Sequence, residues 1–109
     1  MKRLKTETVG SILRSMPEVQ EGAMHGSRAF KVRGKLLACP AIHASAEPDS
    51  WVVAMPADER DRLVAEQPNA CYVTAHYAKN AVVLVRLAEF DRKALRSLLE
   101  RAYRWLNRA

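Results

Sequence analysis

The residues best suited to chemistry are cations placed around two expected turns between strands. Lys31, Arg33 and Lys35 flank the first turn, Lys79 lies in the second, and Arg86 ends the strand that follows it. Lysine and arginine at a hairpin tip contact phosphate oxygens without reading bases. If all five did so, the affinity for duplex DNA would fall with a log–log salt slope of about −4 to −5. The competing interpretation is that these charges keep exposed strands from pairing edge to edge.

Three histidines, His25, His43 and His76, are the candidates for metal binding or acid–base chemistry. Their separations match no metal-ligand spacing, and no acidic residue stands near His76 in the sequence. Tyr77 follows His76 at the mouth of the second turn, where its ring could stack on a base. We therefore count His76 and Tyr77 among the candidate nucleic-acid contacts. The alternative is that the two side chains hydrogen-bond within the turn.

Motifs of known enzyme classes are absent from the sequence. It contains no nucleophile elbow, no phosphate-binding loop and no dinucleotide fingerprint, and its glycines are isolated. We expect a non-enzymatic protein with no catalytic residues, no metal site and no cofactor.

Length and charge narrow the class of protein. A chain of 109 residues forms one domain, and its net charge of +6 attracts polyanions. The longest apolar run, 81–85, is far shorter than the roughly 20 residues of a membrane span, so we expect no membrane partner. Residues 1–7 are basic without an apolar stretch behind them, which favours the cytoplasm. Cys39 and Cys71 are expected as buried free thiols.

Apolar periodicity and turn residues predict the elements that must position these side chains. They are a helix over about 6–16, a strand over 19–24, a hairpin over 29–37 whose return strand extends to 39, a loop over 40–48, a strand over 51–55, a short helix of about ten residues from 56, a second hairpin over 71–87 and a helix after 91. Connections between most strands are too short for crossover helices, so the sheet is mainly antiparallel. The fold class is α+β, with the N- and C-terminal helices packed on the sheet, a short helix between strands and two β-hairpin wings.

Helix ends and faces add detail. Thr6 and Asp91 are the expected N-caps of the first and last helices. Apolar residues along the last helix form one stripe, and four cations occupy the opposite side: Lys93, Arg101, Arg104 and Arg108. Glu100 lies one turn before Arg104 and is its expected ion-pair partner. The apolar residues over 82–85 alternate onto both faces, which predicts a central strand covered on both sides.

Several segments together resemble the MmcQ/YjbR-like family. They are Phe30-Lys31-Val32-Arg33-Gly34-Lys35, Tyr72-Val73-Thr74-Ala75-His76-Tyr77, Val83-Leu84-Val85-Arg86-Leu87, the helix exit Met16-Pro17-Glu18-Val19-Gln20-Glu21-Gly22 and the last-helix residues Leu95-Arg96-Ser97-Leu98-Leu99-Glu100 and Tyr103-Arg104. Their order and spacing cover nearly the whole chain, from about residue 7 to residue 106.

The resemblance implies a small α+β domain of the CyaY-like layout, in a family often described as DNA-binding through two β-hairpin wings. This chain departs from the family pattern at two positions. Ala75 stands where a proline commonly precedes the His-Tyr pair, and Ala81 stands where a proline or a bulky residue often precedes the strand. Both changes predict a less rigid second wing.

The sequence therefore leaves three candidate functions. The first is a module that contacts duplex DNA phosphates through Lys31, Arg33, Lys35 and Lys79, without catalysis. The second is a protein-interaction or regulatory module that uses the same hairpins to add strands to a partner, with Tyr77 as anchor. The third is a small-molecule or catalytic site around His76 and Tyr77. The sequence does not determine the oligomeric state.

Overall fold

The computed structural model describes residues 4–24 and 26–108. His25, one of the three histidines considered for metal binding or acid–base chemistry, lies outside these residues. Within them the chain order is α1 (Thr6–Arg14), β1 (Val19–Met24), β2 (Ser27–Val32), β3 (Lys35–Pro40), β4 (Ser50–Ala54), α2 (Ala57–Glu66), β5 (Cys71–Tyr72), a 3₁₀ turn η1 (Tyr77–Lys79), β6 (Val82–Arg86), a second 3₁₀ turn η2 (Leu87–Glu89) and α3 (Arg92–Arg108).

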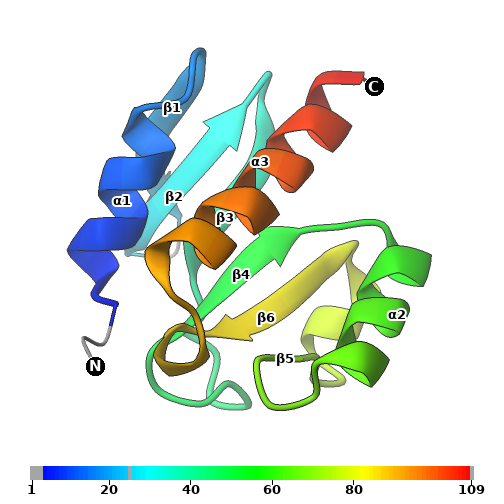
Figure 1. Ribbon diagram of the computed structural model, residues 1–109. Helices are drawn as coiled ribbons and strands as arrows, with labels where there is room; N and C mark the ends of the chain where they lie inside the picture. Colours follow the sequence, from blue (N-terminus) through cyan, green and yellow to red (C-terminus); the bar gives the residue numbers. More distant parts are fainter. Residues whose placement is uncertain (1–3, 25, 109) are drawn as a thin grey trace.

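The strands form one antiparallel sheet in the order β1-β2-β3-β4-β6-β5. Helices α1 and α3 lie across the same face of this sheet, and α2 packs beside β5 and β6 (Figure 1). The predicted α+β class and the three predicted helices are therefore confirmed. None of the helices in the described ranges is both long and apolar enough to cross a lipid bilayer.

The main core lies between the sheet and the two long helices. Helix α3 buries one stripe against it: Leu95, Leu98, Leu99, Ala102 and Leu106. Phe30 and Trp51 meet them from the sheet with ring centroids 6.1 Å apart. The helix begins as predicted, because Ala94 N–H donates to the Asp91 carboxylate at 2.7 Å. Apolar periodicity alone was enough to place this layer.

The first helix begins at Thr6, as predicted, but its capping and its C-terminal end differ from the prediction. Its N-cap is Lys5, which makes no side-chain capping bond, so the expected Thr6 cap is wrong. The α-helix ends at Arg14 because Ser15 and Met16 N–H groups bond carbonyls three residues back, as in a 3₁₀ turn. The Ser15 hydroxyl donates to the Ile12 carbonyl at 2.6 Å and holds this tighter turn.

The hairpin of β2 and β3 turns where the sequence predicted. Val32 pairs with Lys35, and Arg33 and Gly34 between them have φ of 54° and 77°. Two consecutive positive φ values give a two-residue turn whose twist matches that of the strands. This connection is a tight, well-defined tip.

The second predicted hairpin is wrong in its first arm. β5 contains only Cys71 and Tyr72, which pair with Val85 and Leu84 of β6. Residues 73–81 form a loop instead of a strand and a tight turn. The reason is local hydrogen bonding, because Ala78 N–H donates to the Thr74 carbonyl and Asn80 N–H to the Tyr77 carbonyl. These bonds replace the ladder that a longer arm would need.

A second, smaller apolar cluster covers the face of the sheet opposite α1 and α3. Its centre is Val52, Val82 and Leu84, and side chains from the segments 36–46 and 72–77 pack against it. Since β6 is buried on both faces, the prediction of a doubly covered central strand is confirmed. Here loops, not helices, provide the cover.

Candidate functional site

The β2–β3 turn and the end of α3 bring cations together. The Arg33 guanidinium donates from Nη1 to the Asn107 carbonyl at 3.1 Å, so the turn lies beside the last turn of α3. Figure 1 shows these two segments side by side. Arg104 and Arg108 are exposed on α3, one helical turn apart. We call Arg33, Lys35, Arg104 and Arg108 the basic cluster. Lys31 pairs with Leu36, which packs on the opposite face of the sheet, so its side chain points away from α3.

Acidic side chains on and near α3 pair with cations outside the basic cluster. Within residues 4–24 and 26–108, no ion pair joins a carboxylate to any member of the basic cluster. The expected pairing of Glu100 with Arg104 is wrong, because the Glu100 carboxylate lies 3.6 Å from Arg96 Nη1. Arg101 is 3.8 Å from Glu59 of α2. Carboxylates thus lie beside Arg96 and Arg101 in the middle of α3, whereas none in the described ranges forms an ion pair with Arg104 or Arg108.

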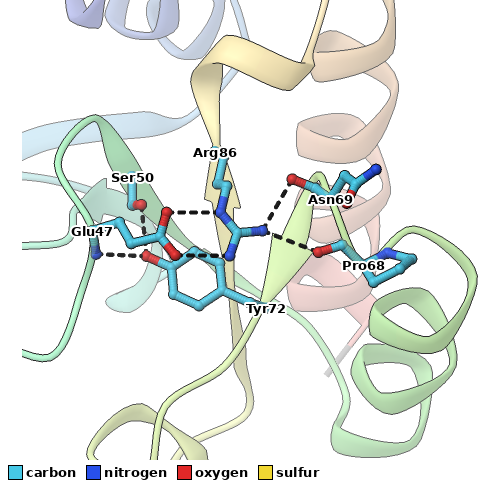
Figure 2. Close-up of polar contacts among 6 residues, drawn as sticks. All are labelled: Glu47, Ser50, Pro68, Asn69, Tyr72 and Arg86. Atoms are coloured by element: carbon cyan, nitrogen blue, oxygen red, sulfur yellow. Dashed lines mark hydrogen bonds and ion pairs between the residues drawn. The ribbon is translucent and has the colours of Figure 1, made fainter.

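Arg86 was predicted as a phosphate contact, and its guanidinium is held by other parts of the fold. Its Nε and Nη2 donate to the two carboxylate oxygens of Glu47 at 2.9 and 2.8 Å. Its Nη1 donates to the carbonyls of Pro68 and Asn69, both at 3.0 Å (Figure 2). The guanidinium carbon also lies 4.2 Å from the ring centroid of Tyr72. A guanidinium engaged on every edge has no free fork for a phosphate.

The same group of contacts fastens a loop to the sheet. Tyr72 Oη accepts a hydrogen bond from Glu47 N–H at 2.8 Å and shares another with the Ser50 hydroxyl at 2.7 Å. The hydrogen bonds between Arg86 and Glu47 favour the charged form of both groups. They lower the pKa of the Glu47 carboxyl and raise the pKa of the Arg86 guanidinium. Arg86 thereby joins the 41–49 loop, the β5–β6 edge and the turn after α2. Its role is structural.

His76 and Tyr77 lie in a different place from the basic cluster, on the rim of a cavity. This cavity, of about 550 Å³, lies on the sheet face opposite α1 and α3. Its floor is apolar and includes Leu36, Val52 and Val82. His43, which had no signal linking it to His76 in the sequence, stacks on it with ring centroids 3.6 Å apart and planes inclined by 7°. The Tyr77 ring stands edge-on to both imidazoles.

The electrostatics of this rim favour neutral imidazole at His76. Loss of hydration lowers the pKa of His76, and the neighbouring His43 and Lys79 lower it further. Lys79 thus acts beside His76, on the 3₁₀ turn that precedes β6, whereas Arg33 of the first hairpin lies at the end of α3. The sequence had grouped both as hairpin-tip cations.

The environment of both thiols disfavours the thiolate form. Cys39 and Cys71 are unpaired, and burial raises the pKa of each to about 11. No group of three or more potential metal ligands (His, Cys, Asp or Glu) comes together in residues 4–24 and 26–108.

The sequence model of the YjbR family matches residues 14–105, which is most of the chain. The chain belongs to the YjbR family. A solved structure, the Deinococcus radiodurans protein DR2400 with a DUF419 domain, superposes with a TM-score of 0.76 at 18% sequence identity. The match covers 94% of this chain and 78% of that one, so this YjbR member shares its fold. No protein with curated annotation matches the chain.

Proposed function

We propose that this YjbR-family protein is a non-enzymatic module that binds the phosphates of duplex DNA through the basic cluster. The observation that carries the proposal is the hydrogen bond of Arg33 to the Asn107 carbonyl, which brings the tip of the first hairpin to the end of α3. Arg33 and Lys35 contribute from the hairpin, and Arg104 and Arg108 contribute from α3. Its free cysteines are typical of a reducing compartment, so we place its action in the cytoplasm.

One effect opposes anion binding here, and its magnitude is small. The C-terminal end of a helix carries a partial negative charge of about half an electron. Arg33 donates to one of the carbonyls responsible, and Arg108 lies in the same turn. Four full positive charges outweigh that half charge, so we expect the surface to attract phosphate. These contacts read no bases, and we expect weak sequence preference.

Salt dependence measures the number of phosphates engaged. If the four cations each displace a counterion, the log–log slope is about −3.6. Between 50 and 200 mM salt, the affinity should then fall about 150-fold. Fluorescence anisotropy with a labelled 20-base-pair duplex gives both the affinity and the slope.

Paired variants locate the surface. Arg33→Ala with Lys35→Ala, and separately Arg104→Ala with Arg108→Ala, should each reduce the slope by about 2. The matched control is Arg92→Ala with Lys93→Ala, which removes two exposed charges from the other end of α3. Equal losses in all three double variants would mean that only net charge matters, and the proposed surface would be wrong. Binding that ignores salt, or no binding at 50 mM salt, would refute the proposal altogether.

The rival function, a protein-interaction module, depended on Tyr77 as a free anchor. The Tyr77 hydroxyl accepts a hydrogen bond from His43 N–H at 3.1 Å, so its polar end is already used within the fold. A partner retained in a pull-down at high salt and after nuclease treatment would favour this function over DNA binding.

A further inference from the structure

We propose that the cavity beneath His43, His76 and Tyr77 binds a small amphipathic anion, with a planar apolar body and one carboxylate. It is separate from the basic cluster and independent of DNA binding. Its volume of about 550 Å³ lies within the range of small-molecule sites, roughly 300–1,000 Å³.

The cavity offers an apolar body a place to bind. Leu36 and Cys39 of β3, Val52 of β4 and Val82 of β6 line it. Ile42 lies at its edge with 55% of its surface exposed, and no other large hydrophobic residue in the described ranges is that exposed. A ligand in the cavity would shield Ile42 from water, which accounts for an apolar side chain at this place.

The rim offers the carboxylate hydrogen-bond donors. His43 Nδ1 accepts a hydrogen bond from Ser45 N–H at 3.0 Å, so the neutral ring carries its proton on Nε2. Neither His43 Nε2 nor the His76 ring hydrogen-bonds to a described residue. The two imidazoles stack with centroids 3.6 Å apart, and the backbone N–H of His43 donates a hydrogen bond to Tyr77 Oη. These contacts hold the rings in place. Rings fixed before binding lose little entropy when a ligand arrives.

Charge selects an anion over a neutral or cationic ligand. The residues that line the cavity include Arg28 and two histidines but no aspartate or glutamate. Glu21 lies 3.5 Å from Arg28 Nε and offsets part of that charge, whereas Lys79 adds its field at His76. A carboxylate between the two imidazoles accepts hydrogen bonds from the N–H groups of the neutral rings, within the field of Lys79.

Three probes of the same shape test the proposal: 2-naphthoate, neutral 2-naphthylmethanol and cationic 2-naphthylmethylamine. Each is titrated into uniformly ¹⁵N-labelled full-length protein and followed by ¹H–¹⁵N correlation spectra. We expect 2-naphthoate to bind with a Kd of about 1 mM or tighter. Its shifts should centre on Leu36, Val52, His76 and Val82. The alcohol should bind at least about 5-fold more weakly, and the amine more weakly still.

Variants separate the cavity from the rest of the molecule. Ala44 is an exposed loop residue that lines the opening, so Ala44→Trp should block 2-naphthoate without disturbing the core. His76→Phe keeps a stacked ring but loses the donor, and should weaken 2-naphthoate about 5-fold while leaving the alcohol unchanged. The matched control Lys35→Ala removes a cation outside the cavity and should not change naphthoate binding.

The two proposals fail separately. Equal affinity for the three probes, shifts centred outside the cavity, or no shift with 5 mM 2-naphthoate would overturn the anion site. Unchanged 2-naphthoate binding by Ala44→Trp would overturn it as well. None of these results bears on the salt-dependent DNA titration, and loss of DNA binding in the basic-cluster variants leaves the cavity intact.

Discussion

Replacing Arg86 by alanine should destabilise the protein without weakening DNA binding by the folded molecule. The change removes two hydrogen bonds to the carbonyls of Pro68 and Asn69 and a cation–π contact with Tyr72. It leaves the charge of the basic cluster untouched. A phosphate-binding role for Arg86 predicts the reverse pattern.

The magnitude follows from the exposure of these contacts. The side chain of Arg86 is 26% exposed, so water replaces part of what is lost, and each carbonyl bond is worth about 1 kcal/mol. The contact with the Tyr72 ring adds about 0.5–1 kcal/mol. The ion pair with Glu47 is largely exposed and adds little. The free energy of unfolding should therefore fall by about 2–3 kcal/mol.

Urea unfolding followed by tryptophan fluorescence measures this change, because Trp51 is buried. The midpoint should move down by between about 1 and 2 M with the slope unchanged. Arg86→Lys keeps the charge but not the planar fork, and should recover less than half of the loss. Lys35→Ala, which removes an exposed cation that has no ion-pair partner among the described residues, should change stability by less than about 0.5 kcal/mol.

Two outcomes contradict the reasoning. One is an Arg86→Ala variant within about 0.5 kcal/mol of the parent protein, which would mean that the contacts are not maintained in solution. The other is a loss of DNA affinity by the folded variant as large as that of Lys35→Ala. That result would return Arg86 to the binding surface.

Three further predictions concern single positions. Asp91→Ala removes the cap of α3 and should lower the free energy of unfolding by about 1 kcal/mol, measured by urea titration. Asp91→Asn keeps a capping oxygen and should lose less, so equal losses would contradict a capping role. Gly34→Ala places a side chain on backbone with φ of +77° and should lower the free energy of unfolding by about 1 kcal/mol. Gly22→Ala is the control, because Gly22 has no such strain, and equal effects of the two changes would contradict a cost specific to the turn. The pKa of His76 is lowered on folding, so its neutral form stabilises the fold above its unfolded pKa of about 6.5, and stability should decline as pH falls from 7 to 5. This decline should be shallower in His76→Phe, and identical pH profiles for the two proteins would show that His76 does not contribute.

The parts of the fold that sequence reasoning predicted correctly depend on local chemistry. Apolar spacing placed α3 because one helical face must be buried, and Asp91 marked its start. Gly34 located the first turn because a positive φ there costs glycine little. The second wing was predicted wrongly because residues 73–81 satisfy their backbone through local bonds that alternation of side chains does not reveal.

The sequence by itself determined the α+β class, the position of most elements, the family and the excess of positive charge. Only the tertiary structure decided which cations remain available to a partner. Arg86 and Glu47 are 39 residues apart, and Arg33 and Asn107 are 74 apart, yet each pair is in contact. His43 likewise stacks on His76 from a separate loop. Periodicity reports which face of an element is buried, whereas contacts between distant elements depend on strand register and loop path, which become definite only when the whole chain packs.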